Sequence, residues 1–133
     1  VFDDTDALRS LQAARRPLCL FGHTHVPAIF TLLEPRPVDD KPRARANREL
    51  DRTVPVHGSP FRLDLDSQSQ YLVNCGAVGQ PRDGDPRAAF GLLDTDARVV
   101  TIMRTTYDVA AAQARIVAAG LPEVLAQRLA TGR

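Results

Sequence analysis

The sequence of 133 residues predicts a mixed domain of strands and helices, in the α/β or α+β class. Two observations lead to this prediction: short apolar runs of strand length fill the middle of the chain, and helical patterns flank them at both ends. The length suits one domain, spanning residues 1–133. No apolar run approaches the ~20 residues that a transmembrane helix needs, so we expect no membrane partner.

The first helix is expected over residues 5–15, with Thr5 or Asp6 as its N-cap and Pro17 beyond its end. The apolar run Leu18–Phe21 follows and is typical of a strand that is buried on both faces. Further strands are predicted at residues 26–33, 61–65, 71–74, 88–93 and 98–104.

The C-terminal part of the chain changes to a helical period. Asp108 is a good N-cap, and Gly120 lies where a helix commonly ends in the left-handed conformation. Pro122 fits the first turn of a last helix. Apolar stripes predict the buried faces of the two helices, with Val109, Ala112, Ile116 and Val117 in the first and Leu121, Val124, Leu125 and Leu129 in the second.

Residues 34–60 differ from the rest because they combine five prolines with many charges of both signs. This composition predicts an exposed, mobile, variable loop with a short strand near residues 52–56. The basic residues at its centre have acidic neighbours, so we interpret them as a solvated loop tip; they are Lys41, Arg43, Arg45 and Arg48. A net charge of +1 also argues against a nucleic-acid partner.

Two cysteines, Cys19 and Cys75, cannot form a disulfide framework, which favours a reducing, cytoplasmic location. The acidic first residues lack the basic and apolar regions of a signal peptide. The chain begins with Val1 and not with Met, so we expect a processed product or a piece of a longer protein.

The sharpest chemical feature is the segment Gly22-His23-Thr24-His25-Val26-Pro27, directly after the first predicted strand. Two imidazoles at this spacing, on a turn that follows a strand, can point toward one metal ion or toward two neighbouring ions. Gly22 would let the backbone turn sharply there. The alternative interpretation is an ordinary pair of loop histidines.

A second feature is the loop that begins at Asn74 and runs to Arg87. Its glycines, Gly76, Gly79 and Gly84, would allow close approach of the backbone. Free N–H groups of the loop, together with Arg82, are suited to holding an anion. A purely structural turn is the alternative.

Together these segments resemble the calcineurin-like metallophosphoesterases, in particular a small bacterial branch related to diadenosine tetraphosphatases. The resemblance rests on His23-Thr24-His25-Val26-Pro27 and, more specifically, on the long segment from Tyr71 to Ala88, and it covers most of the chain outside residues 34–60. It implies a four-layer α/β/β/α sandwich with a mixed sheet and flanking helices, of which this chain is the C-terminal half.

The family also needs an Asp-x-His, a Gly-Asp, a Gly-Asn-His-Asp/Glu and a further His upstream of its Gly-His-x-His, and none precedes Gly22 here. Within the chain, the resemblance makes His23 and His25 metal ligands. It places Gly22, Asn74, Gly76, Gly79 and Arg82 around them as supporting or substrate-loop residues. No catalytic residue beyond these ligands is assigned, and we expect the chain alone to be inactive.

Two departures from the family pattern matter. Cys75 and Ala77 replace a Pro and a Ser of the family's Asn-Pro-Gly-Ser, and we interpret Cys75 as a small buried hydrophobe and not as a metal ligand. His57 lies in a His-x-Ser-Pro that the family places upstream of the histidine pair, so the ligand role is not carried over to His57.

The resemblance implies that the parent protein is a hydrolase with two divalent ions, such as Mn, Fe or Zn, acting on a small phosphorylated substrate. Phosphomonoesters, phosphodiesters and dinucleoside polyphosphates all stay open. The alternative from another class is a non-catalytic α/β binding or scaffold module with an incidental histidine pair. A one-metal, cupin-type site is disfavoured because the first Glu after the pair is Glu34, and the length excludes a barrel of ~250 residues.

Two structural expectations follow. The histidine pair should lie beside the loop that begins at Asn74, because the strands before both segments should be neighbours with their ends at one edge. The chain should also expose apolar side chains around residues 18–33 that the missing N-terminal half, or a second copy in a homo-oligomer, would cover.

Overall fold

The computed structural model describes residues 3–33, 49–55 and 59–133. Ten helices and strands lie in the described part: α1 (Asp4–Ala14), β1 (Leu18–Phe21), β2 (Ala28–Leu33), β3 (Glu49–Thr53), β4 (Phe61–Asp64), β5 (Ser69–Asn74), β6 (Ala88–Asp94), β7 (Val99–Thr105), α2 (Val109–Ala118) and α3 (Glu123–Leu129). Nearly every predicted element is present. The short strand expected near residues 52–56 lies at Glu49–Thr53 instead, and the rest of the 34–60 segment is mostly outside the described residues.

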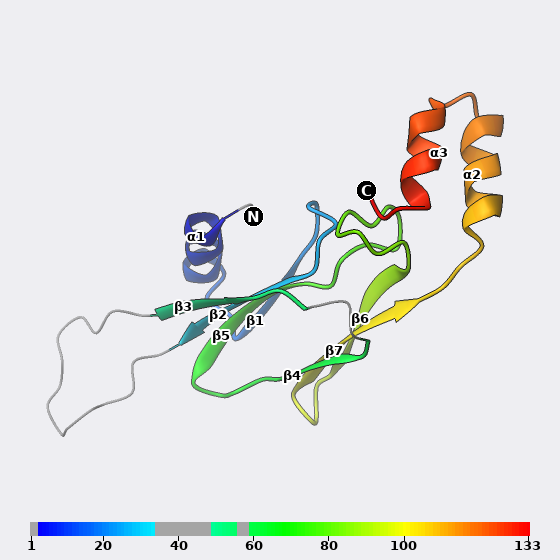
Figure 1. Cartoon of the computed structure of the whole chain (residues 1–133). Helices are drawn as coiled ribbons and strands as arrows, with labels where there is room; N and C mark the ends of the chain where they lie inside the picture. Colours follow the sequence, from blue (N-terminus) through cyan, green and yellow to red (C-terminus); the bar gives the residue numbers. More distant parts are fainter. Residues whose placement is uncertain (1–2, 34–48, 56–58) are drawn as a thin grey trace, which may run out of the picture.

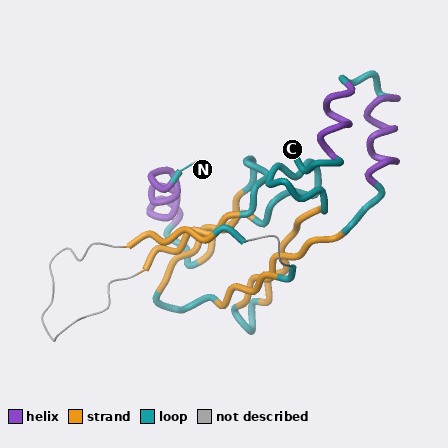
Figure 2. The backbone as a smooth tube through the Cα atoms, in the orientation of Figure 1, coloured by secondary structure: helices purple, strands orange, loops and turns teal. Residues whose placement is uncertain are grey.

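The strands form two sheets (Figure 1). A four-stranded sheet has the order β1-β5-β2-β3, in which β1 and β5 are parallel and the other neighbours are antiparallel. A three-stranded antiparallel sheet has the order β4-β7-β6. Helix α1 lies against the four-stranded sheet, while α2 and α3 form a hairpin at the opposite end of the molecule (Figure 2). The mixed class predicted from the sequence is confirmed.

Two apolar clusters hold the layers together. The first lies between α1 and the four-stranded sheet, where Leu11 packs with Phe30 and Leu32. The second lies between the two sheets, where Ile29 and Val73 meet Val100 and Ile102 of β7, and all four side chains are buried. The described residues therefore stack as helix, sheet and sheet.

The expected burial of Leu18–Phe21 on both faces is wrong. Strand β1 is at an edge of its sheet, and Leu20 is 60% exposed. Leu33 on β2 is also exposed, but residues 28–30 and Leu32 are buried. The expectation of uncovered apolar side chains around residues 18–33 is thus met at Leu20 and Leu33 only.

The helix ends differ in part from the predicted caps. The N-cap of α1 is Asp3, whose carboxylate accepts a hydrogen bond from the Asp6 N–H at 2.8 Å, and not Thr5 or Asp6. Asp108 caps α2 as expected, accepting from the Ala111 N–H at 2.8 Å. Gly120 has the predicted left-handed backbone, with φ of 70°.

The apolar stripes of the C-terminal hairpin are less buried than their pattern predicts. No residue of α2 is buried, and Val117, Leu121 and Val124 are each about half exposed. Only Ala126 and Leu129 of α3 are buried. The two helices pack on each other and not on a sheet. No helix of the described residues has the length and apolar character needed to cross a membrane.

Candidate functional site

The histidine segment and the loop after Asn74 begin side by side. Strands β1 and β5 are parallel neighbours, and their last residues, Phe21 and Asn74, are paired in register. Parallel strands that end together present the loops that follow them at one edge of the sheet. The predicted proximity of the two segments is therefore confirmed.

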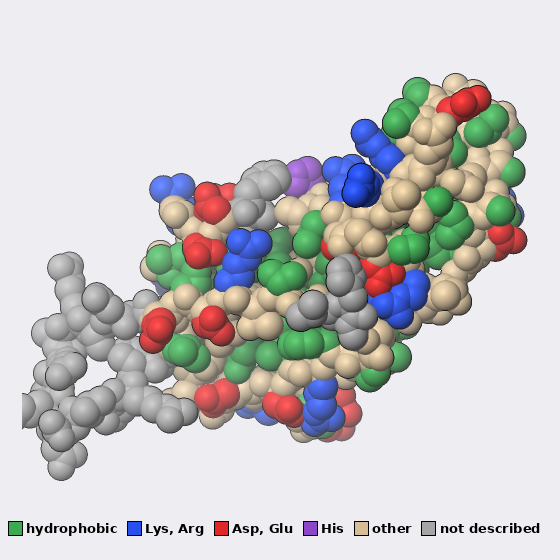
Figure 3. Space-filling model, viewed as in Figure 1, with side chains coloured by type: hydrophobic (Ala, Val, Ile, Leu, Met, Phe, Trp, Pro, Cys, Tyr) green, Lys and Arg blue, Asp and Glu red, His purple; other side chains and the backbone are tan. Residues whose placement is uncertain are grey.

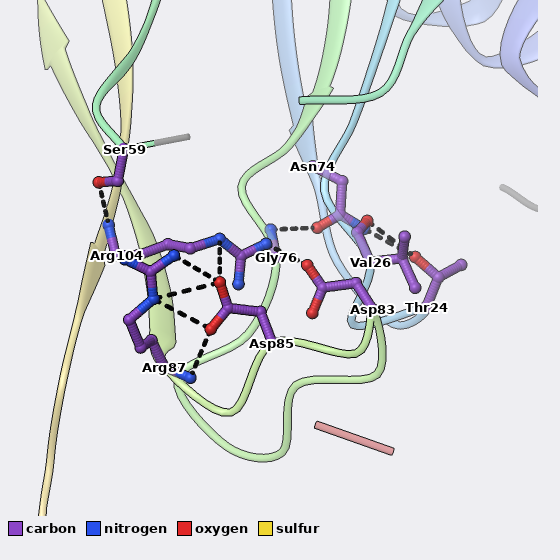
Figure 4. A network of polar contacts seen from close by, with 9 residues as sticks. All are labelled: Thr24, Val26, Ser59, Asn74, Gly76, Asp83, Asp85, Arg87 and Arg104. Carbon is purple, nitrogen blue, oxygen red and sulfur yellow. Dashed lines mark hydrogen bonds and ion pairs between the residues drawn. The ribbon is translucent and has the colours of Figure 1, made fainter. Parts of the chain in front are cut away.

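Asn74 joins the two segments directly (Figure 4). Its side chain is fully buried. Its amide nitrogen donates to Thr24 Oγ1 at 2.9 Å and to the Gly22 carbonyl at 3.4 Å, and its amide oxygen accepts from the Gly76 N–H at 2.9 Å. One side chain thus fixes the turn between the two histidines and the start of the second loop.

The two histidines are held in an unusual backbone conformation. His23 and His25 have φ of 80° and 61°, in the left-handed region that is uncommon for residues other than glycine. Strain of this kind persists where the surrounding structure determines the conformation, and it often occurs at binding or catalytic sites. His23 is exposed and His25 is half-buried.

Gln80 positions His25. The Nδ1 atom of His25 lies 2.7 Å from the Gln80 carbonyl oxygen, and the Arg82 N–H donates to the His25 carbonyl at 3.2 Å. Because a carbonyl oxygen only accepts, Nδ1 carries the proton in this contact. The Nε2 atom of a neutral His25 is then the nitrogen with a lone pair for a ligand.

The glycines of the site have different roles. A Cβ at Gly76, where φ is +92°, would lie 2.7 Å from the Ala89 Cβ and 3.0 Å from Pro27 Cγ, so close approach is confirmed there. Gly84 has a φ of +84° in open space. Gly22 and Gly79 have no neighbour within 4 Å of such a Cβ and no positive φ, so the predicted close approach is not found at Gly79 and Gly22 does not adopt the left-handed conformation.

Ion pairs connect aspartates of the second loop to arginines of the loop and of β7 (Figure 4). Arg104 of β7, with a side chain only 4% exposed, pairs with Asp83 and lies 3.6 Å from an oxygen of Asp85. Arg87 forms a further pair with Asp85 at 2.6 Å. Hydrogen bonds from Arg87 hold the pKa of Asp85 well below its usual range. Sequence reasoning singled out Asp83, Asp85 and Arg87 only as loop residues.

Gln80 and the C-terminal residues were also missed. The Gln80 side-chain amide donates to the Arg133 carbonyl at 2.9 Å, and the Gly84 N–H donates to the Gly132 carbonyl at 2.9 Å. These bonds attach the end of the chain to the second loop, across some 50 residues of sequence. Gln80 lay inside the segment that carried the family resemblance, but nothing in the local pattern assigned it a contact.

Cys75 behaves as a packed thiol. It packs on the cluster between the two sheets, and burial raises the pKa of its thiol. A raised pKa disfavours the thiolate that a metal ligand requires. This agrees with the interpretation of Cys75 as a small hydrophobe; His57 lies outside the described residues.

Two imidazoles are the metal donors that the site offers. Within residues 3–33, 49–55 and 59–133, no group of three or more His, Cys, Asp or Glu side chains is arranged to hold a metal ion. Arg82 is exposed at the rim of the same loop. Figure 3 shows a histidine on the surface beside arginine side chains.

Comparisons with known proteins place this geometry in context. No family model matches the chain. It is 42% identical over 116 residues to an uncharacterized protein of Methanocaldococcus jannaschii. The matched region covers 87% of this chain and 40% of that protein. The chain is 36% identical to a metallophosphoesterase of Sphaerobacter thermophilus of known crystal structure, with a TM-score of 0.78 over the whole of this chain and 50% of that one.

The chain therefore has a metallophosphoesterase-type, calcineurin-like fold. It spans half or less of the length of both proteins that it matches.

Proposed function

We propose that the chain forms one part of a metal-dependent phosphoesterase, to which it contributes His23 and His25 as metal ligands. The observation that carries the proposal is the contact of His25 Nδ1 with the Gln80 carbonyl at 2.7 Å. Histidines that bind metals commonly donate their second ring N–H to such an acceptor, which fixes the tautomer and the ring orientation. The similarity to a metallophosphoesterase along the whole chain supports the same assignment.

The donor chemistry suits divalent ions of the first transition series. Neutral imidazole is a ligand for Zn, Fe and similar ions, and Mn accepts it beside carboxylates. Two imidazoles do not complete a metal centre, and the described residues add no third donor group. The remaining ligands are then supplied by the N-terminal half of the parent domain. When bound, paired ions lower the pKa of a water molecule and neutralise charge on phosphoryl oxygens.

The residues of this chain serve such a centre by position. Asn74 holds the turn between the histidines, and Gln80 orients the ring of His25. Gly76 lets the second loop pass close to Pro27, directly after the histidines. Arg82 at the rim offers a guanidinium to a phosphate group. Phosphomonoesters, phosphodiesters and dinucleoside polyphosphates are the substrate classes that fit.

One observation favours a second candidate. The absence of a third metal donor among the described residues suits a non-catalytic binding or scaffold module. In that case the left-handed histidines only shape a loop, and loss of their imidazoles would change no activity of the parent protein.

Hydrolysis by the full-length gene product separates the two candidates. We expect Mn²⁺-dependent turnover of p-nitrophenyl phosphate or of bis-p-nitrophenyl phosphate, and a loss of about a hundredfold or more in His25→Ala. Arg115→Ala on α2 is the control, because this exposed arginine lies outside the two loops. The 133-residue chain alone should give no turnover above a His23→Ala/His25→Ala double variant. Full activity in His25→Ala would favour the scaffold module.

A further inference from the structure

An open pocket lies between the second loop and the C-terminal end of α3. Its volume is about 570 Å³, within the range of small-molecule sites. The lining residues come from the second loop, from α3 and from the residues after α3, and they are mainly polar or basic: Arg82, Val124, Gln127, Arg128, Thr131 and Arg133. None of them except Arg82 belongs to the histidine site described above.

The two walls of the pocket are fixed to each other. The Gln80 side chain bonds the Arg133 carbonyl, and the Gly84 N–H bonds the Gly132 carbonyl, both at 2.9 Å. Gly132 is buried, and a Cβ there would lie 2.7 Å from the backbone of Asp85. Such close packing means that the pocket is a consequence of how the chain folds and not of a loose C-terminal helix.

The charged side chains that line the pocket are all basic. Arg82, Arg128 and Arg133 line it, and no Asp or Glu side chain does. None of the three guanidinium groups forms an ion pair with another residue of the described part of the chain. The aspartates nearest along the second loop, Asp83 and Asp85, are instead engaged by Arg104 and Arg87.

The pocket adjoins the histidine pair. The Arg82 N–H donates to the His25 carbonyl, and Gln80 contacts His25 through its own carbonyl and Arg133 through its side chain. Arginine side chains lie between a histidine on the surface and α3 on the face seen in Figure 3. A ligand in the pocket would therefore lie beside the groups that we assign to the metal centre.

We propose that this pocket, called here the arginine pocket, binds a chain of two or more linked phosphates in the substrate, next to the phosphoryl group that is cleaved. Guanidinium groups form paired, charge-assisted hydrogen bonds with phosphate oxygens. The pocket is large for a single phosphate, so its three guanidinium groups can contact more than one phosphate of a chain. The proposal rests on the proposed function for its role in catalysis, but the binding itself needs no metal.

Calorimetric titration of the metal-free 133-residue chain with sodium tripolyphosphate tests it. We expect binding that weakens as salt is raised, and a loss of about tenfold in affinity for Arg82→Ala and for Arg128→Ala. Arg9→Ala is the matched control, because Arg9 is exposed, does not line the pocket, and lies on α1 at the other end of the molecule from α3 (Figure 1). Circular dichroism spectra verify that each variant is folded.

Parallel titrations with ATP and with orthophosphate identify the source of the phosphates. ATP binding that depends on the same two arginines indicates a nucleotide, and binding of tripolyphosphate alone indicates an inorganic chain; both support the proposal. Orthophosphate binding as tight as tripolyphosphate, an equal loss in Arg9→Ala, or no binding would overturn it. Because no metal is present, such a failure is separate from the result of the hydrolysis assay.

Discussion

Among single residues, Asn74 and Gln80 make the contacts that shape the site. Asn74 is buried at the end of β5 and makes three hydrogen bonds to the segments around it. Gln80 contacts His25 through its backbone and Arg133 through its side chain. Both residues thus help to determine where the imidazoles and the C-terminal arginine lie.

Replacement of Asn74 by Ala should destabilise the fold. The substitution leaves the Gly76 N–H without its side-chain acceptor and removes the contact with Thr24, which is expected to cost about 2–3 kcal/mol. Urea unfolding measures the change. Gln68→Ala, at an exposed turn, should cost less than about 0.5 kcal/mol. Equal stability of the two variants would show that the Asn74 network is unimportant.

Asp85 should make stability depend on pH in the acid range. Its pKa in the folded chain is held below the ordinary value by Arg87, so the unfolded chain binds the proton more tightly. The contribution is therefore complete at neutral pH and is lost as pH falls below about 4, toward the lower folded pKa.

Asp85→Asn should flatten this acid dependence when the free energy of unfolding is measured from neutral pH down to about 2. The matched control is Asp64→Asn, since Asp64 also pairs with an arginine two residues away, Arg62, but both side chains are exposed. Solvent screening should make the effect of the control small. An unchanged acid slope in Asp85→Asn would contradict the assigned pairing.

At the level of the elements, the attachment of α3 to the second loop forms the arginine pocket. It depends on Gly132, where the backbone is left-handed and a side chain would meet Asp85. Gly120 offers a comparison, because its φ of +70° is similar and the space around it is open. Comparing the same substitution at Gly132 and at Gly120 therefore separates the cost of a steric clash from the cost of a strained backbone.

Gly132→Ala should lower the free energy of unfolding by about 2 kcal/mol or more, and Gly120→Ala by about 1 kcal/mol. The first variant should also lose tripolyphosphate binding, since the walls of the pocket separate. Chemical unfolding and calorimetry measure the two effects. Equal costs, with binding intact in both, would mean that the packing of Gly132 on the loop is not required.

The elements themselves were largely predictable from the sequence, because apolar runs and capping residues are local signals. Leu18–Phe21 was correctly predicted as a strand, and Asp108 as a cap. The place of β1 at an edge was not predictable, since an apolar run does not say which neighbours a strand has. The same limit hid the pairing of Arg104 with Asp83 and the bond from Gln80 to Arg133, which join residues that are far apart in the sequence.

The candidate site was predicted in part. The motif around His23 and His25 and the start of the second loop were identified, and their proximity followed from two strands ending together. The sharp turn was assigned to Gly22, whereas the residues with left-handed backbone are the two histidines. A glycine pattern indicates where the backbone is free to turn, but not which residue adopts the unusual conformation.

For the molecule as a whole, one edge of the four-stranded sheet is formed by β1. Among the described strands, β1 pairs with β5 alone, and Leu20 on it is 60% exposed. Exposed edges with apolar side chains favour pairing with another chain. This is the place where the N-terminal half of a parent domain, or a second copy of this chain, would add strands.

We expect the isolated 133-residue chain to self-associate through this edge. Size-exclusion chromatography with light scattering should find a dimer or a larger species, and Leu20→Lys should shift it toward the monomer. Leu92→Lys is the control, because Leu92 is similarly exposed but lies on β6 in the other sheet. If the unmutated 133-residue chain is a monomer, or if both variants show the same shift, association through β1 is contradicted.

The metal content of the full-length gene product shows whether the histidine pair belongs to a metal centre. The full-length gene product is loaded with Mn²⁺ or Zn²⁺, freed of excess ion, and analysed by elemental mass spectrometry, beside His23→Ala, His25→Ala and the control Arg115→Ala. We expect about two ions per chain in the unmutated protein and in the control, and a loss of at least one ion in each histidine variant. Equal metal content in all four proteins would contradict it.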